Sequence, residues 1–443
     1  MASITFVTGV EHGKSRAIAE SRPIVIGRSA ECDIALNDAV VSSRHARIER
    51  TPAGWTITDL DSSNGTFVQR RRIKHPTPIE NGMLIDLGDE VAFRFYAGAE
   101  EGQTPPEATP EELALIQQMA DRTERIRREV GKVIIGQTEV VDQLIMVMLA
   151  GGHGLLVGMP GMAKTLMVST VAKVLDLEFR RIQFTPDLMP TDMTGTEVLE
   201  TDRTTQEKTF RFLRGPIFCN LLLADEINRT PPKTQAALLE AMQEKRVTVG
   251  NVTYPLDAPF FVLATQNPIE QEGTYPLPEA QLDRFMYNIW VDYPQEHEEE
   301  EIVRTTTAAV PAVPEKILSK QDVLQLQSVV RKIPVSPHVV KYTIRLVRST
   351  RPGDARAPDF VRQFVATGAG PRAGQYLVLA AKARAVMEGR LHVSCADIRR
   401  AALPVLRHRI LTNFAADSEG LTPVKLIEKL LAAVEEPTER DYA

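Results

Sequence analysis

The sequence predicts a multidomain protein with an all-β N-terminal sandwich, a central α/β domain on a parallel sheet, and a C-terminal α-helical domain. Short β-rich runs separated by turn residues fill residues 1–97. Apolar runs that alternate with helical segments occupy residues 111–312, as expected for a parallel sheet covered on both faces. Residues 313–443 have helical periodicity only, and the acidic, Pro- and Gly-rich residues 98–110 are predicted to be a linker.

The composition is that of a globular protein with no overall basic character. Of 443 residues, 43% are hydrophobic and 25% are charged, which excludes wholesale disorder. Residues 1–97 hold 12 basic and 12 acidic side chains, so the net charge of −6 arises entirely after them. A chain that acts mainly by coating nucleic acid is therefore disfavoured.

The cysteines and apolar segments predict a cytoplasmic protein without a membrane span. Cys32, Cys219 and Cys395 are odd in number and far apart, which fits buried thiols better than disulfides or a metal site. Charge appears too early at the N-terminus for a signal peptide, and glycines interrupt the longest apolar stretch, residues 144–158.

The N-terminal strands are predicted from alternating or β-rich runs between turns. Asn64-Gly65 and Asn81-Gly82 supply turn residues. The runs are ITFVTG, PIVIG, ARIER, WTITDL, GTFV and EVAFRFY.

The central domain begins with a predicted helix over 111–130. Three apolar runs then predict buried parallel strands, because they are short and continuous. Helical segments such as Lys233–Gln243 lie between or after them. The runs are GLLVG at 154–158, NLLLADE at 220–226 and FFVLATQN at 260–267.

A glycine-rich turn between the first strand and the next helix has the residues of a phosphate loop. Small residues let backbone N–H groups converge on a phosphate, and the helix directs its positive end there. Lys164 would contact the β- and γ-phosphates, and Thr165 would ligate Mg²⁺. Ala163 stands where glycine is usual, so we expect a right-handed backbone there. The candidate residues are Gly158, Pro160, Gly161, Met162, Ala163, Lys164, Thr165 and Leu166.

Polar residues end the next two strands. Asp225 could hold Mg²⁺ through water, and Glu226 could polarise an attacking water. Asn267 could bond that water or the γ-phosphate. A plain strand end and a turn before Pro268 are the competing interpretations, which the phosphate loop makes less attractive.

The order of these motifs, followed by Arg284 in LDRF and Arg372 in GPRAG, resembles the AAA+ ATPase module and within it the MoxR family. Either arginine alone would be taken for a solvated side chain. The resemblance covers about residues 111–443 and is most specific over 221–244 and 261–285.

The resemblance implies an ATPase that uses ATP and Mg²⁺. Lys164 and Thr165 correspond to Walker A, Asp225 and Glu226 to Walker B, and Asn267 to sensor 1. Arg372 corresponds to sensor 2. The segment VIIGQ, with Ile135 and Gly136, corresponds to the part that packs on adenine. Residues 187–212 resemble the insert in helix 2, and residues 246–256 the hairpin before sensor 1.

Arg284 corresponds to an arginine finger that contacts the nucleotide of a neighbouring subunit. The family therefore implies a homo-oligomer, typically a hexameric ring, that acts on a protein client, often with a von Willebrand factor A-type partner. If Arg284 acts in trans, a monomer should be nearly inactive.

Three short motifs in the N-terminal domain together resemble a forkhead-associated (FHA) domain. They are Gly27-Arg28, Ser42-x-x-His45 and Asn64-Gly65-Thr66, and the resemblance covers about residues 3–96.

An FHA domain implies phosphothreonine binding, for which a guanidinium and hydroxyl donors suit a phosphate near −2. Arg28 and Ser42 would bind the phosphate, Ser43 or Arg44 would add a contact, and Asn64 would hold the peptide backbone. His45 is expected to shape the loop from behind. Asn64-Gly65 could instead be a simple hairpin turn. The basic run of Arg70, Arg71, Arg72 and Lys74 is more simply a solvated face than a contact for acidic phosphopeptides.

The leading hypothesis is a phosphothreonine-guided AAA+ ATPase that remodels or matures a protein client. The alternative is a phosphopeptide-binding scaffold whose nucleotide controls assembly. A nucleic-acid motor and a phosphate-loop kinase fit less well, because no nucleic-acid signature stands out and the later motifs suit a hydrolytic ring. Thr104 or Thr109 in the linker is a weaker candidate for a phosphorylated residue that docks at Arg28.

Overall fold

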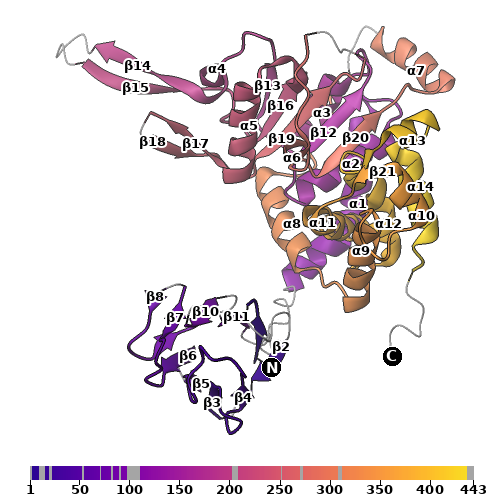
Figure 1. Ribbon diagram of the computed structural model, residues 1–443. Coiled ribbons are helices and arrows are strands. Elements are labelled where there is room, and N and C mark those ends of the chain that lie inside the picture. The colour runs from indigo at the N-terminus through magenta and orange to yellow at the C-terminus, as the bar shows by residue number, and fades with distance from the viewer. Residues whose placement is uncertain are drawn as a thin grey trace. The chain divides into compact units, whose positions relative to one another are not determined.

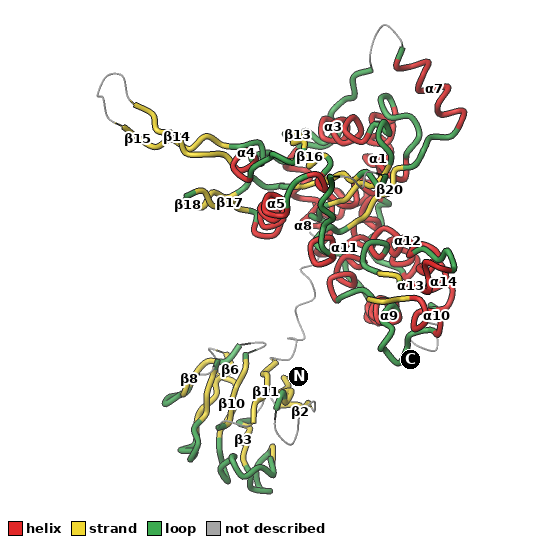
Figure 2. Tube along the Cα trace, turned by 45° about the horizontal axis from the view of Figure 1, so that its top comes forward, coloured by secondary structure: helices red, strands yellow, loops and turns green. Residues whose placement is uncertain are grey.

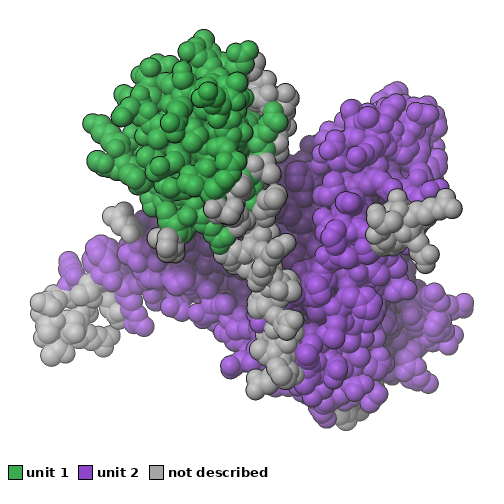
Figure 3. Space-filling model, turned by 90° about the horizontal axis from the view of Figure 1, so that it is seen from below, with its two compact units in different colours: residues 1–106 green, residues 107–443 purple. Residues whose placement is uncertain are grey.

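The chain divides after residue 106 into two units, coloured separately in Figure 3. The computed structural model describes residues 2–8, 15–18, 22–51, 54–69, 71–80, 83–88, 91–96, 110–201, 208–250, 252–269, 273–307 and 312–436. The predicted linker, apart from Pro110, lies outside the described residues, as do Thr104, Thr109, Arg70 and the Asn81-Gly82 turn.

The N-terminal unit is the β-sandwich that the sequence predicts. Alternating side chains such as Ile26, Ile48, Ile57, Ile85 and Phe93 are fully buried in one cluster between two sheets. The first sheet has the order β2 (Ser15–Ile18), β1 (Ala2–Phe6), β11 (Val91–Tyr96), β10 (Leu84–Leu87), β7 (Thr66–Val68), β8 (Arg71–Arg72). The second has the order β4 (Ile34–Ala35), β3 (Ile24–Gly27), β5 (Ala46–Thr51), β6 (Gly54–Asp59), β9 (Thr77–Pro78).

The second unit is built on a five-stranded sheet in which every pairing is parallel. The three predicted strands form its centre. The two edge strands were not predicted, because their partly exposed residues break the continuous apolar run that marks a buried strand. The order is β13 (Phe179–Gln183), β16 (Leu221–Asp225), β19 (Phe261–Gln266), β12 (Gly154–Gly158), β20 (Tyr287–Val291).

Both faces of this sheet are covered, as expected. Along β16, Leu221 and Leu223 enter one hydrophobic cluster with residues of helices α1, α2 and α3, whereas Leu222 and Ala224 enter another with residues of helix α5. The alternation follows from the pleat of a strand. The helices of this part are α1 (Pro110–Gly131), α2 (Thr138–Leu149), α3 (Lys164–Val174), α4 (Pro190–Thr194), α5 (Pro232–Glu244), α6 (Glu279–Leu282) and α7 (Glu296–Thr306), with a 3-10 turn η1 (Ile227–Arg229).

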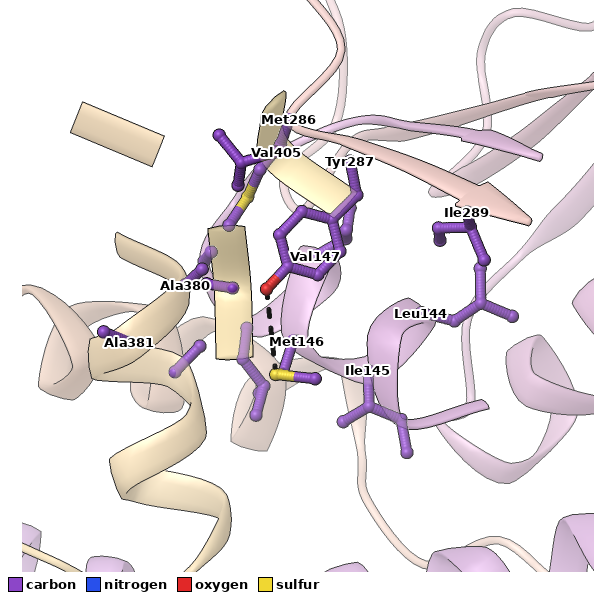
Figure 4. Packing of buried hydrophobic residues seen from close by; sticks show 14 of the residues in the cluster. Leu144, Ile145, Met146, Val147, Met286, Tyr287, Ile289, Ala380, Ala381 and Val405 are labelled. Carbon is purple, nitrogen blue, oxygen red and sulfur yellow. Dashed lines mark hydrogen bonds between the residues drawn. The ribbon is translucent and has the colours of Figure 1, made fainter. Parts of the chain in front are cut away.

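The C-terminal helices share a core with the sheet. Tyr287 of β20, Met146 of α2, Ala380 of α11 and Val405 of α12 meet in one buried cluster (Figure 4). A small antiparallel pair, β21 (Val365–Thr367) and β22 (Leu411–Thr412), interrupts a region expected to be purely helical. The helices are α8 (Lys320–Lys332), α9 (Pro337–Ser349), α10 (Asp359–Phe364), α11 (Pro371–Met387), α12 (Cys395–Leu406), α13 (Phe414–Ser418) and α14 (Pro423–Ala433).

Two antiparallel hairpins extend side by side from the sheet (Figures 1 and 2). They are β14 (Gly195–Thr201) with β15 (Lys208–Arg214), and β17 (Arg246–Val249) with β18 (Val252–Pro255). The Phe212 and Tyr254 rings stack with centroids 4.2 Å apart, which joins the hairpins. The first hairpin lies in the segment expected to be the helix 2 insert, residues 187–212, except for its last two residues. The second lies within residues 246–256, the hairpin expected before sensor 1.

All three cysteines are buried free thiols, as expected. Among the described residues, no helix combines the length and apolar character needed to cross a bilayer.

Candidate nucleotide site and candidate phosphopeptide site

The predicted phosphate loop joins β12 to α3. Gly158 ends the strand, and a Cβ there would clash with the carbonyl oxygen of Val291 on β20, so glycine is needed for strand packing. Ala163 precedes the helix with φ 52° and ψ 23°. The expectation of a right-handed backbone at Ala163 is therefore wrong: the loop holds an alanine in the left-handed region, at a cost of roughly 1–2 kcal/mol.

One cavity of about 420 Å³ brings together most of the residues predicted for the nucleotide. Its lining comes from the phosphate loop and the ends of β16 and β19, because the carboxyl ends of parallel strands meet at one edge of a sheet. The lining residues are Pro160, Gly161, Met162, Ala163, Lys164, Thr165, Leu166, Asp225, Glu226, Thr265, Gln266 and Asn267.

Lys164 and Thr165 line this cavity together with the carboxylates of Asp225 and Glu226. The ammonium of Lys164 donates to the carbonyl oxygens of Gly158 at 2.5 Å and Met159 at 2.9 Å, and burial lowers the pKa of Lys164. The Thr165 hydroxyl lies 3.4 Å from Oδ2 of Asp225. A hydroxyl and a carboxylate at this spacing are hard oxygen donors, so these residues fit Mg²⁺.

Both carboxylates are held by neighbouring side chains. Asp225 accepts from the Thr265 hydroxyl at 2.5 Å and from Nε of Arg181 at 2.8 Å. Glu226 accepts from the Gln183 amide at 2.6 Å, and its backbone has φ 56°. A left-handed glutamate at a strand end is a strained conformation of the kind that clusters at functional sites.

Asn267 lies at the cavity and also makes the contact expected from the competing turn interpretation. It lines the cavity, and its Oδ1 accepts from the backbone N–H of Ile269 at 3.2 Å, which is a turn-forming contact.

Sequence reasoning missed Arg181, Gln183, Thr265 and Gln266. Thr265 could have been found, since it lies two residues before Asn267 in the predicted run 260–267, and residues two apart in an extended chain share a face. Arg181 and Gln183 lie on the unpredicted strand β13, whose Gln183 pairs with Asp225.

Ile135 and Gly136 line a different cavity, of about 390 Å³, between the end of α1, the start of α2, and α7. Its residues include Val130, Ile134 and Glu301, and none of its lining residues also lines the phosphate-loop cavity.

Arg284 and Arg372 lie outside the lining of the phosphate-loop cavity. Arg284 donates to the carbonyl oxygen of Leu239 at 2.7 Å and lines a cavity of about 370 Å³ beside α5. Arg372, in the first turn of α11, forms an ion pair of 2.9 Å with Asp283, the residue before Arg284.

Arg409 also anchors the Asp283 segment. Its side chain is 2% exposed, and its Nε lies 2.7 Å from Oδ1 of Asp283. Tyr376 of α11 donates its hydroxyl to the carbonyl oxygen of Arg284 at 3.0 Å. The C-terminal helices thus hold the segment that carries Arg284. Asp283 and Arg409 were not singled out from the sequence, because the two residues lie 126 positions apart.

The predicted phosphopeptide residues lie on loops of the sandwich. Arg28, Ser43, Arg44 and Asn64 are exposed and Ser42 is half-buried. The Arg28 N–H donates to the carbonyl oxygen of Ser42 at 2.9 Å, and the Ser42 hydroxyl accepts from the N–H of Ser63 at 3.0 Å. The Asn64 amide donates to the carbonyl oxygen of Val40 at 2.8 Å. These contacts fix the loops against one another.

His45 is fully buried beneath these loops. Its Nδ1 accepts from the N–H of Ser42 at 3.1 Å, so its Nε2, 3.1 Å from the carbonyl oxygen of Gly65, is the nitrogen that donates. Burial lowers the pKa of His45. The neutral ring connects the two loops, which is the geometry that a supporting role requires.

The fold and the phosphate-loop site define an AAA-type ATPase joined to an FHA domain. Residues 153–287 match the model of the ATPase family associated with various cellular activities (AAA), residues 360–430 match the AAA lid domain, and residues 24–88 match the FHA domain. The chain is 42% identical over 351 residues to Chaperone MoxR1 of Mycobacterium tuberculosis, a match that covers 77% of this chain and 92% of that one. It belongs to the MoxR family of AAA+ ATPases.

Two further relatives match the chain, one over the ATPase part and one over the FHA domain. A crystal structure of a protein from Cytophaga hutchinsonii has 43% identity and a TM-score of 0.68, covering 73% of this chain and 98% of that one. The FHA domain-containing protein FhaB of Mycolicibacterium smegmatis is 30% identical over 77 residues, which cover 17% of this chain and 50% of FhaB.

Proposed function

We propose that this protein is an ATP-hydrolysing MoxR-type chaperone that forms a ring, by family analogy a homo-hexamer, and remodels a protein client selected through phosphothreonine. The observation that supports it most is the cavity shared by Lys164, Thr165, Asp225, Glu226 and Asn267. A cation, a hydroxyl, two carboxylates and an amide around one loop of backbone donors suit a nucleoside triphosphate.

The roles of these residues follow from their chemistry. Thr165 and Asp225 would hold Mg²⁺, which neutralises phosphate charge when bound. Lys164 would exchange its carbonyl partners for the β- and γ-phosphate oxygens. Glu226 would orient and polarise the attacking water, and Asn267 would bond that water or the γ-phosphate.

Two arginines outside the phosphate-loop cavity, Arg284 and Arg372, are proposed to complete the nucleotide site. Arg284 lines a cavity beside α5 rather than its own phosphate-loop cavity, as a residue that acts on a neighbour's nucleotide would. Arg372 would act on the nucleotide of its own subunit. Ile135 and Gly136 would contact adenine through apolar and backbone atoms.

The FHA domain would bind a phosphothreonine on the client or on a partner. Arg28 and Ser42 would bind the phosphate, assisted by Ser43 or Arg44, and Asn64 would hold the peptide. The proposed protein partner is a von Willebrand factor A-type protein, and nucleic acid is not a proposed partner. A cytoplasmic location is also proposed, with which the buried free thiols agree.

Steady-state ATP hydrolysis by the wild type and Glu226→Gln tests the enzymatic proposal. We expect the substitution to reduce turnover by roughly 10²-fold or more, because the positioned base is lost while nucleotide binding is kept. Equal, near-zero rates in both proteins would favour the scaffold in which nucleotide controls assembly. With ATP, Glu226→Gln should also retain a bound client in a pulldown.

A further inference from the structure

Arg181 contacts Asp225 at the carboxylate oxygen that faces Thr165. Its Nε and Nη2 lie 2.8 Å and 2.7 Å from the same oxygen of Asp225, Oδ2. The Asp225 carboxylate is only 11% exposed, whereas the Arg181 side chain is 47% exposed. The arginine therefore reaches in from the solvent side and neutralises a buried charge.

The two oxygens of Asp225 have different partners. Oδ1 accepts from the Thr265 hydroxyl at 2.5 Å, and Thr265 in turn accepts from the N–H of Glu226 at 2.8 Å. Oδ2 faces the Thr165 hydroxyl at 3.4 Å. Since Thr165 and Asp225 are the proposed Mg²⁺ residues, the guanidinium covers the oxygen that a cation between them would use.

Arg181 also connects the two carboxylates. Its Nη2 donates to Oε1 of Gln183, and the Gln183 amide donates to Glu226 at 2.6 Å. A movement of the guanidinium away from Asp225 would remove one hydrogen-bond partner of the side chain that holds Glu226.

We infer that Arg181 is a positioning residue that serves as the counter-ion of Asp225 before Mg²⁺–nucleotide binds, and that its displacement sets how much Mg²⁺ the site requires. Two cations cannot share one carboxylate oxygen without strong repulsion, so metal binding and the Arg181–Asp225 pair compete. The inference rests on the proposed ATP site. It adds that the Arg181 guanidinium must leave Asp225 before Mg²⁺ can bind there.

The test is a Mg²⁺ titration of the binding of a fluorescent ATP analogue to the full-length chain. Arg181→Gln should lower the half-saturating Mg²⁺ concentration by roughly two- to tenfold, because the competing cation is gone. Arg181→Lys should restore a requirement close to that of the wild type. Arg180→Gln is the matched control, because Arg180 is the adjacent residue on β13 and pairs with Glu178 at 2.9 Å instead.

Two further arms separate this role from others. In an Asp225→Asn chain, Arg181→Gln should no longer change the Mg²⁺ dependence, and thermal unfolding without nucleotide should report a folded protein in every variant. An unchanged Mg²⁺ requirement in Arg181→Gln would overturn the inference, as would weaker analogue binding at saturating Mg²⁺, which would make Arg181 a nucleotide ligand. Failure of the wild type to bind the analogue at any Mg²⁺ concentration would instead overturn the proposed function.

Discussion

The candidate nucleotide site and the FHA loops both carry side chains that suit phosphate, but they hold these polar side chains differently. In the nucleotide site, Lys164 bonds backbone carbonyls and Asp225 pairs with Arg181. In the FHA domain, backbone contacts and the buried His45 fix the loops, while Arg28 and Arg44 are exposed.

The two sites differ in how many existing contacts a ligand must break in order to bind. A ligand at the nucleotide site has to exchange internal partners, so binding there is coupled to rearrangement. The FHA loops already hold their backbone in place and present the charged groups outward, so binding there requires less rearrangement. This contrast suits the two proposed functions, because an ATPase has to change its contacts during turnover whereas a recognition domain only has to hold its ligand.

The largest effect should come from Arg284, which is proposed to act on the nucleotide of a neighbouring subunit. Arg284→Ala should reduce ATP turnover by roughly 10³-fold while leaving nucleotide binding largely intact, since such an arginine stabilises charge only in the transition state. Turnover and analogue binding are measured in parallel. Arg246→Ala is the control and should keep wild-type turnover. Arg246 is an exposed arginine at the start of β17 that pairs with Glu244, the last residue of α5. Wild-type turnover in Arg284→Ala would remove Arg284 from the site.

The sheet beneath the nucleotide site should be acid-sensitive through His153. The buried ring accepts from the N–H of Val262 at 2.9 Å and faces the carbonyl oxygen of Met242 at 3.2 Å, and burial lowers the pKa of His153 from 6.5 to about 4. Unfolding restores the ordinary pKa, so the unfolded chain binds the proton more readily. The free energy of unfolding should therefore fall as pH drops from 6.5 to about 4, by about 3 kcal/mol in total.

Denaturant unfolding of the wild type and His153→Gln across this pH range measures that contribution. His408 is half-buried and its pKa is also held well below 6.5, mainly by removal of the ring from water. It adds a loss of the same sign to both proteins, so their difference isolates His153. Parallel pH profiles would show that the His153 ring does not carry the effect.

A smaller effect is expected at the FHA loops. Arg28→Ala should weaken binding of a phosphothreonine peptide by roughly 10- to 100-fold, because one charge-assisted contact of about 1.5–3 kcal/mol is lost from loops that stay in place. Peptide titration by fluorescence polarisation measures it. Arg22→Ala, at an exposed arginine paired with Asp33, should bind like the wild type. Equal affinity in Arg28→Ala would exclude Arg28 from the phosphate site.

The sequence predicted the buried framework of both regions well. Continuous apolar runs identified β12, β16 and β19, and the phosphate loop followed from its residue types. Edge strands β13 and β20 were not predicted, because four of the five residues of β13 and two of the five residues of β20 are not buried. The left-handed Ala163 was misjudged, since a local propensity of about 1–2 kcal/mol yields to the geometry of the surrounding loop.

The sequence by itself therefore determined the order of the domains, the central strands and the residues that end them. Buried strands and helices leave a characteristic spacing of apolar residues along the chain, which can be recognised without the structure. Only the tertiary structure decided which distant side chains meet. Arg181 on Asp225, and Arg372 and Arg409 on Asp283, join residues 44, 89 and 126 positions apart. Their pairing depends on the crossing order of parallel strands and the packing of α11 and α12, which no local pattern encodes.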